Sequence, residues 1–480
     1  MKLTVEQIAG ATGGEIINRG QRQCDGVSTD SRTIEPGMLF IPIVGNRFDG
    51  HDFIKEVLER GAAGFVFSDQ KLSASKAAEL AKSRQAAAVS VNNTLRALGD
   101  LARFVRDSVP GLKVVAITGS TGKSTTKEML AGILSFSVRV ARNEGNLNNL
   151  VGLPLSLLAL SGDVDVVVLE MGTNTPGEIA RLAQIAKPDA ACVTNVGPVH
   201  LEGLQTVEGV AREKGALPLA LGREGIFAAN CDDPNVVAMA ERSNAKLICY
   251  GLGNKHPVNC RKFITARDIK IGPESSAMIL KIGKKESPVT IHAPGIHNVM
   301  NALAAAALAS GIGSSIEEIA AGVDKWRPME MRSEVRKLGR DVTVIVDCYN
   351  SNPVSLLAAL KIFEKFSGRR VAVIGDMLEL GDFAAQAHYQ AGAAAANSGV
   401  KILVAVGEWA ETIKKGFIEQ SDSGAEALAV ENAEKASASV LERIRDGDVI
   451  LVKASRLLHL ETVVEAIVKV VGVMSERNIT

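Results

Sequence analysis

Residues 113–134 read KVVAITGSTGKSTTKEMLAGIL, and this stretch decides the class of fold. Residues 113–117 form a short apolar run typical of a buried parallel strand, and residues 127–134 have the apolar spacing of a helix. The turn between them is rich in glycine, serine and threonine. Such a turn presents backbone N–H groups to phosphate oxygens at the start of a helix. The stretch therefore predicts an α/β fold with a parallel sheet and a phosphate-binding loop, which implies ATP as a ligand.

Two residues of the predicted phosphate loop have a chemical role. Lys123 is placed to reach the β- and γ-phosphates, and the Ser124 hydroxyl is placed to bind Mg²⁺. Ile117 stands six residues before Lys123, where the usual GxxxxGK[ST] pattern has glycine. A chance loop of small residues is the alternative, and the flanking strand and helix argue against it. The whole loop is Thr118, Gly119, Ser120, Thr121, Gly122, Lys123, Ser124 and Thr125.

A phosphate loop needs an acidic residue on a second strand to hold its metal ion. Residues 166–169 are apolar and are followed by Glu170, at the position where that acid is expected. Taken alone, Glu170 would be interpreted as an ordinary carboxylate at a strand end. Together with the phosphate loop, it becomes a candidate metal ligand. His200 follows another predicted strand, and Lys214 comes fourteen residues later. From the residues alone, a surface histidine and a solvated lysine remain open alternatives for these two.

Composition narrows the class of protein. The chain has 480 residues, 54 Lys+Arg against 54 Asp+Glu, and 46% hydrophobic residues. This length predicts about three domains at roughly 100 to 200 residues each. The balanced charge argues against a nucleic-acid partner, and the scattered cysteines argue against a disulfide framework or a zinc site. The sequence has no apolar run of about 18 residues and no signal-peptide pattern at its start, so a cytoplasmic protein without membrane insertion is expected.

The pattern along the chain predicts three α/β domains, at residues 1–88, 89–322 and 323–480. The first is expected to be a small α/β module and the second a parallel-sheet ATPase domain. Period-two alternation within residues 260–293 predicts an antiparallel hairpin that closes the second domain. The third domain is expected to be Rossmann-like, because strands alternate with helices in it. Its predicted strands are residues 342–346, 370–374, 402–406 and 449–452.

Seven motifs resemble, in order and spacing, those of the Mur ligases. The motifs lie at residues 118–125, 143–154, 170–172, 195–202, 297–302, 347–353 and 375–381. The resemblance runs from Asp30 to Arg456 and so covers nearly the whole chain. It implies an ATP-dependent, ADP-forming ligase that joins D-alanyl-D-alanine to UDP-N-acetylmuramoyl-tripeptide through an acyl phosphate, in the synthesis of a peptidoglycan precursor. A monomer is expected.

The resemblance also implies roles for individual residues. The N-terminal module would hold the UDP-sugar, and two asparagines of the second motif would add substrate contacts; these substrate residues are Asp30, Ser31, Arg32, Asn46, His51, Asn146 and Asn149. The nucleotide would meet Asn298, Asn301, Arg332 and Asp347. One Mg²⁺ would lie between Ser124 and Glu170, and a second near His200 and a carbamylated Lys214. Lys123, His200 and Lys214 would be catalytic. Carbamylation is intelligible because a desolvated lysine near other cations loses its proton and can then capture CO₂.

Three rival functions remain at this point. The preceding ligase of the same pathway carries an Asp-Asn-Pro-Arg segment, whereas residues 232–235 here read DDPN and lack the arginine. Folylpolyglutamate synthase shares the phosphate loop but not the pattern at residues 145–154. A non-catalytic, nucleotide-gated binding protein would not need His200 and Lys214. The sequence departs from the family pattern at Met331 and Ala454, where glycine is usual, and at Cys348. These departures bear on the backbone geometry expected beside Arg332 and Lys453.

Overall fold

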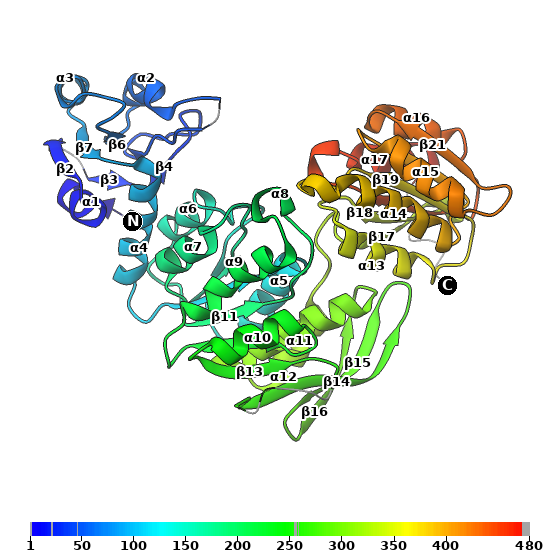
Figure 1. Cartoon of the computed structure of the whole chain (residues 1–480). Helices are drawn as coiled ribbons and strands as arrows, with labels where there is room; N and C mark the ends of the chain where they lie inside the picture. The colour runs from blue at the N-terminus through cyan, green and yellow to red at the C-terminus, as the bar shows by residue number, and fades with distance from the viewer. Residues whose placement is uncertain (1, 21–22, 46, 254–256, 258, 473–480) are drawn as a thin grey trace.

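The computed structural model describes residues 2–20, 23–45, 47–253, 257 and 259–472. Three α/β units follow one another along the chain, each built around its own sheet (Figure 1). The expected three-domain α/β fold is therefore confirmed. No helix in the described ranges is long and apolar enough to cross a membrane.

The N-terminal unit contains a five-stranded mixed sheet in the order β2-β7-β6-β5-β4, with β1 and β3 paired separately. Helix α1 begins with a capping box between Thr4 and Gln7, which satisfies backbone N–H groups at the helix start. The elements are β1 (Lys2–Leu3), α1 (Val5–Thr12), β2 (Glu15–Asn18), β3 (Cys24–Asp25), β4 (Val27–Ser28), β5 (Leu39–Phe40), η1 (Gly50–Phe53), α2 (Ile54–Glu59), β6 (Gly64–Ser68), α3 (Ala74–Arg84) and β7 (Ala87–Val91).

The central unit has a nine-stranded sheet in the order β16-β15-β14-β13-β12-β11-β8-β10-β9. Its strands run parallel from β9 to β14, and β14, β15 and β16 pair antiparallel. The predicted antiparallel hairpin is the pair β15 and β16, and β14 adds a third antiparallel strand. The strands are β8 (Lys113–Thr118), β9 (Val140–Arg142), β10 (Val166–Glu170), β11 (Ala190–Val193), β12 (Ile226–Asn230), β13 (Lys246–Tyr250), β14 (Lys262–Ile271), β15 (Ser276–Ile282) and β16 (Lys285–Ile291).

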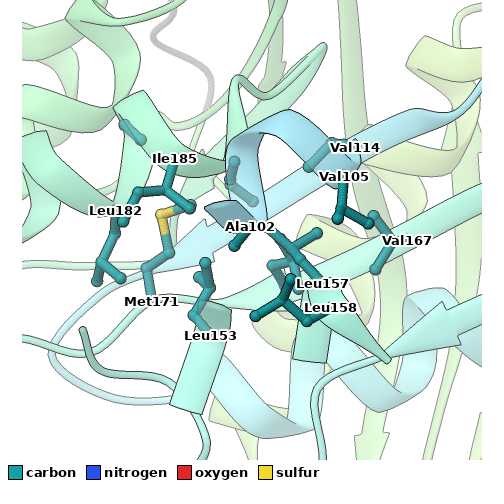
Figure 2. Close-up of a cluster of buried hydrophobic side chains, with 14 of the residues drawn as sticks. Ala102, Val105, Val114, Leu153, Leu157, Leu158, Val167, Met171, Leu182 and Ile185 are labelled. Atoms are coloured by element: carbon teal, nitrogen blue, oxygen red, sulfur yellow. The ribbon is translucent and has the colours of Figure 1, made fainter. Parts of the chain in front are cut away.

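Helices cover both faces of this sheet, so β8 and β10 are buried on two sides as continuous apolar runs. On one face, α4, α6 and α7 bury Val105, Leu157 and Ile185 against Val114 and Val167 (Figure 2). On the other, α11 lies in a second core that includes Val115 and Val168. The helices are α4 (Thr94–Ser108), α5 (Lys123–Leu134), α6 (Gly152–Leu158), α7 (Glu178–Ala186), α8 (Leu201–Leu204), α9 (Val207–Leu219), α10 (Pro234–Arg242), α11 (Ile296–Ile312) and α12 (Ile316–Lys325).

The C-terminal unit has a six-stranded sheet in the order β17-β18-β22-β19-β20-β21, in which all pairs except β17 with β18 are parallel. The elements are β17 (Glu334–Lys337), η2 (Gly339–Asp341), β18 (Thr343–Asp347), α13 (Pro353–Phe363), β19 (Arg370–Gly375), η3 (Gly381–Phe383), α14 (Ala384–Asn397), β20 (Ile402–Val406), α15 (Ala410–Gln420), β21 (Glu426–Val430), α16 (Ala433–Leu441), β22 (Val449–Lys453), η4 (Arg456–Leu458) and α17 (Glu461–Val471). The four predicted strands correspond to β18, β19, β20 and β22.

Candidate active site

A cavity of about 690 Å³ is lined by residues of both the central and the C-terminal units. The central unit contributes the phosphate loop at the carboxyl end of β8, where ligands of parallel sheets bind. The C-terminal unit contributes the segments that follow β18, β19 and β22. Described residues that line the cavity include Lys123, Ser124, Thr125, Glu170, Asn298, Asn301, Arg332, Asp347, Tyr349, Glu379 and Lys453.

Two glycines of the phosphate loop occupy positions where no other residue fits. Gly119 has φ +150°, and a Cβ there would lie 1.8 Å from Thr194 Oγ1. Gly122 has φ +80°, and a Cβ there would lie 2.2 Å from Asn301 Oδ1. These contacts explain the glycine pattern by packing as well as by backbone freedom. Lys123 closes the loop by donating from Nζ to the Gly119 carbonyl at 2.8 Å.

The loop is also braced by the chain that follows β11, a role that sequence reasoning missed. Asn195 Oδ1 accepts the Thr121 N–H at 3.0 Å, and Thr194 Oγ1 donates to the Thr121 carbonyl at 2.6 Å. Ser120 Oγ accepts the Gly197 N–H at 2.8 Å. Thr118 is buried and donates from Oγ1 to the Met171 carbonyl. The signals for this brace in the sequence were the polar segment directly after a predicted strand and the motif at residues 195–202.

Glu170 and Ser124 form the acidic side of the site. Ser124 Oγ donates to Glu170 Oε2 at 2.6 Å, and Asn148 Nδ2 donates to Oε1 at 2.9 Å. Asn143 holds the backbone of Glu170 through its amide group, at 2.8 and 2.9 Å. A hydroxyl and a carboxylate oxygen side by side suit Mg²⁺, which takes few protein ligands and completes its shell with phosphates and water. The donor set therefore fits the expected ion.

Of the two adjacent asparagines 148 and 149, Asn148 and not Asn149 reaches the cavity. Asn149 Oδ1 instead accepts the Val151 and Gly152 N–H groups at the start of α6. Asn146, a predicted substrate residue, also lines the cavity. Two adjacent asparagines cannot be told apart by sequence, because their side chains differ only in the direction that the loop gives them.

The electrostatics of Lys123 link the two units. Burial lowers the pKa of its ammonium, the charge of Arg332 lowers it further, and Glu170 and Glu379 raise it. Arg332 and Glu379 come from the C-terminal unit, so charges of both units act on the same lysine. The phosphate loop places Lys123 at the cavity, and charges of the C-terminal unit also act on the pKa of its ammonium.

Lys214 lies on α9 and is 1% exposed. Burial holds the pKa of its amine well below the usual value, the nearby Lys123 lowers it further, and Glu213 raises it. Glu213 accepts the Gly177 and Ile179 N–H groups at 2.7 Å, so it also caps the start of α7. The solvated-lysine alternative is therefore wrong. Lys214 is a buried amine with an enlarged neutral fraction, which is the form that reacts with CO₂.

His200 contacts the C-terminal unit. Its Nδ1 lies 2.5 Å from Glu379 Oε2, and the side chain of His200 is 21% exposed. The hydrogen bond from His200 lowers the pKa of the Glu379 carboxyl, burial raises it, and the His200 and Lys123 charges lower it. Neither His200 nor Lys214, both described, lines the cavity itself. Glu379 was not among the predicted site residues.

The remaining predicted nucleotide residues cluster at the cavity. On α11, Asn298 donates to the Pro294 carbonyl at 2.8 Å. Asp347 accepts from Lys453 Nζ at 2.7 Å, in a pair in which Lys453 is 1% exposed. The guanidinium of Arg332 lies 4.0 Å from the centre of the Tyr349 ring, a cation–π arrangement. The structure thus brings together Asn298, Asn301, Arg332 and Asp347 from two units.

Met331 precedes Arg332 with φ +59°. This left-handed conformation favours glycine, which is usual at this position in the family. Methionine in its place is therefore a strained residue directly before Arg332. The neighbouring Ser333 also has a positive φ, of 50°.

The predicted residues of the N-terminal unit form their hydrogen bonds within that unit. Arg32 donates to both carboxylate oxygens of Asp30, and Ser31 lies between them in the same turn. His51 Nε2 accepts the Ser68 N–H at 2.9 Å, so its proton lies on Nδ1, which is 2.6 Å from Asp49 Oδ1. Both ring nitrogens of His51 are therefore occupied within the protein. Asn46 lies outside the described residues.

Three Mur ligase domain families match the chain: "Mur ligase family, catalytic domain" at residues 23–106, "Mur ligase middle domain" at 117–309 and "Mur ligase, glutamate ligase domain" at 331–456. The UDP-N-acetylmuramoyl-tripeptide–D-alanyl-D-alanine ligase of Bacillus subtilis (strain 168) is 33% identical over 473 residues, which cover 98% of this chain and 99% of that protein. The chain belongs to the Mur ligase family. Members of the family are ATP-dependent peptide ligases, so this Mur ligase is an enzyme that forms a peptide bond with ATP.

Solved Mur ligases share the fold. MurF from Acinetobacter baumannii matches with a TM-score of 0.87 and 29% identity, over 98% of this chain and 99% of that one. MurF from Thermotoga maritima in complex with ADP matches with a TM-score of 0.78 and 26% identity, over 92% and 97% of the two chains. The similarity includes all three units of this Mur ligase.

Proposed function

We propose that this Mur ligase joins D-alanyl-D-alanine to UDP-N-acetylmuramoyl-tripeptide, with conversion of ATP to ADP and phosphate. The observation that supports it best is the phosphate loop, which opens beside Glu170 into a cavity completed by the C-terminal unit. The B. subtilis relative carries this activity in its name and matches over nearly its whole length. A ligase needs such a shared cavity because ATP and two acceptors must meet there.

In the proposed reaction, the terminal carboxylate of the tripeptide attacks the γ-phosphorus of ATP and displaces ADP. The resulting acyl phosphate is attacked by the amine of D-alanyl-D-alanine, and phosphate leaves from the tetrahedral intermediate. Lys123 and Arg332 neutralise charge on the transferring phosphoryl group, since phosphoryl transfer depends mainly on positioning and electrostatic stabilisation. Bound Mg²⁺ would supply further charge neutralisation.

We assign residues to two Mg²⁺ ions as part of this proposal. Ser124 and Glu170 would hold the first, because their oxygens lie together at the cavity. His200 and a carbamylated Lys214 would hold the second. The burial and lowered pKa of Lys214 support the carbamate, since CO₂ reacts with the neutral amine.

The three domains would then divide the substrates. Residues 1–88 would bind the UDP-sugar, residues 89–322 ATP, and residues 323–480 would complete the site for the peptide acceptor. ATP and a nucleotide-linked sugar as substrates make the cytoplasm the proposed compartment, with the enzyme as a monomer. Size-exclusion chromatography with light scattering checks the oligomeric state.

Phosphate release tests the proposed function. We expect release that requires ATP, UDP-N-acetylmuramoyl-tripeptide and D-alanyl-D-alanine together, with the UDP-linked pentapeptide found by mass spectrometry. Tripeptides ending in meso-diaminopimelate or L-lysine, and a panel of D-amino-acid dipeptides, define the specificity. Turnover with a UDP-linked dipeptide and a single diamino acid would instead indicate the preceding ligase of the pathway. Nucleotide binding without turnover would indicate a switch.

A further inference from the structure

The loop between β19 and α14 of the C-terminal unit contacts the central unit. Glu379 in this loop contacts three residues there. Its Oε2 lies 2.5 Å from His200 Nδ1, its carbonyl accepts the Glu202 N–H at 3.4 Å, and its Oε1 accepts from Asn174 Nδ2 at 3.4 Å. Both the backbone and the side chain of Glu379 thus take part in the contact between the units.

The backbone on both sides of this contact is strained. Glu379 has φ +62° and His200 has φ +54°, in the left-handed region that residues with a Cβ rarely adopt. Such conformations persist where the surroundings determine them, and they cluster at functional sites. Here the two strained residues are hydrogen-bonded partners from different domains, so each domain helps to hold the other in its unfavourable conformation.

The hydrogen bond determines which nitrogen of His200 is free. With Nδ1 donating to Glu379, Nε2 is left as the nitrogen able to bind a cation. Histidines that bind metals usually donate their other N–H to a carboxylate, which fixes the tautomer and the orientation of the ring. In this chain the carboxylate comes from the neighbouring domain. Contact between the two domains therefore supplies the hydrogen bond that orients the ring of His200.

We propose that Glu379 is a positioning residue: it orients His200 to bind the second Mg²⁺, and so couples docking of the C-terminal domain to completion of the metal site. The inference rests on the proposed function, because it takes His200 as a ligand of that ion. It predicts that the second ion binds only when the C-terminal domain has docked. It also explains why a glutamate from another domain lines the nucleotide cavity while its carboxylate bonds to the histidine.

Mn²⁺ binding to the full-length protein tests this inference without turnover. We would count and titrate Mn²⁺ by electron paramagnetic resonance, with a non-hydrolysable ATP analogue present. Substitution Glu379→Ala should weaken one of two ions about 10- to 100-fold, because the orienting carboxylate is lost. Glu379→Gln, which keeps an acceptor oxygen, should weaken it less. The control Asp382→Ala removes an exposed carboxylate from the same loop and should bind Mn²⁺ like the wild type.

A double substitution separates orientation of His200 from a general loss of structure. If Glu379 acts through His200, Glu379→Ala should weaken Mn²⁺ no further in a His200→Ala background. Fully additive effects, or wild-type binding of both ions by Glu379→Ala, would overturn the inference. If Glu379→Ala does not fold, the comparison of Glu379→Gln with Asp382→Ala decides in its place. Failure of the proposed function is seen separately, as a wild type that releases no phosphate with all three substrates.

Discussion

The cavity shared by the central and C-terminal units differs from the N-terminal unit in the way its predicted residues form contacts. At the cavity, residues from two units converge on one space, and Lys453 pairs with Asp347 while only 1% exposed. In the N-terminal unit, Arg32 pairs with Asp30 and is 84% exposed. Both ring nitrogens of His51 form hydrogen bonds with groups of the same unit. At the cavity, polar side chains of two units face a common space. In the N-terminal unit, polar side chains form hydrogen bonds and ion pairs with neighbours in the same unit.

This difference shows which kinds of ligand site can be recognised from a sequence motif. A phosphate loop binds through its backbone, so the residues that allow the loop also reveal the ligand. A sugar-binding surface is assembled from exposed side chains, and the same residue types also stabilise turns. The predictions below test whether the two regions differ in function as they differ in structure.

The largest effect is expected for Lys123→Ala. Loss of a few kcal/mol of transition-state stabilisation should lower the rate of phosphate release at least about a hundredfold, while the fold is retained. Thermal unfolding checks the fold. Lys113→Ala, which removes a lysine that is 62% exposed on the preceding strand, is the matched control and should keep its activity. Activity of Lys123→Ala within about tenfold of the wild type would remove this loop from the ATP site.

A loss of similar size is expected for Lys214→Ala if the lysine carries a carbamate. Short carboxylic acids should then partly restore phosphate release, because a free carboxylate can take the vacated space and approach the metal. A lysine that acts through its positive charge predicts rescue by amines instead. Full activity of the variant would remove Lys214 from the site. Lys187→Ala, which replaces an exposed lysine, controls for the loss of a cation.

Asn298→Ala and Asp347→Ala should have intermediate effects. Each should raise the KM for ATP more than the KM for D-alanyl-D-alanine, because the lost contacts concern parts of ATP remote from the reacting phosphate. Asp347→Ala should also lower the stability, since the buried Lys453 loses its carboxylate partner and keeps only backbone carbonyls. Initial rates at varied concentrations of each substrate distinguish the two constants. A change confined to the dipeptide KM would place the adenosine pocket elsewhere.

In the N-terminal unit, His51 and Arg32 should respond in opposite ways. His51→Ala leaves the Ser68 N–H without its acceptor and removes the ring contact to Asp49, so it should lower the free energy of unfolding by about 1–3 kcal/mol. Arg32→Ala removes an exposed ion pair, which contributes little to stability, and should mainly raise the KM for the UDP-linked substrate. Urea unfolding and substrate kinetics on both variants measure the contrast. A stable His51→Ala protein with a raised KM would return His51 to the substrate site.

The smallest effect is expected for Met331→Gly. Glycine relieves the left-handed backbone at this position, with φ +59°, but increases the entropy of the unfolded chain. The two terms oppose each other, so the free energy of unfolding should change by less than about 1 kcal/mol. Methionine and glycine variants should also share the same KM for ATP. A large rise in that KM would show that the Met331 side chain itself shapes the position of Arg332.

The sequence by itself determined the helices, strands and turns that depend on interactions between residues close together in the chain. The run from β8 through the phosphate loop to α5 and the antiparallel hairpin of β15 and β16 were predicted from apolar periodicity and turn residues, and both are confirmed. Strands β9, β12 and β13 were not predicted. As short apolar runs, they become strands through pairing with distant neighbours, which periodicity does not report.

Only the tertiary structure decided which polar side chains meet. It placed Asn148 rather than Asn149 against Glu170, braced Thr121 with Asn195, and brought Glu379 to His200, 179 residues away in sequence. It also showed that Lys214 is buried. Sequence patterns carry the preferences of backbone and apolar side chains, which act over a few residues. The direction of a polar side chain depends on loops and domain contacts that form only when the whole chain has folded.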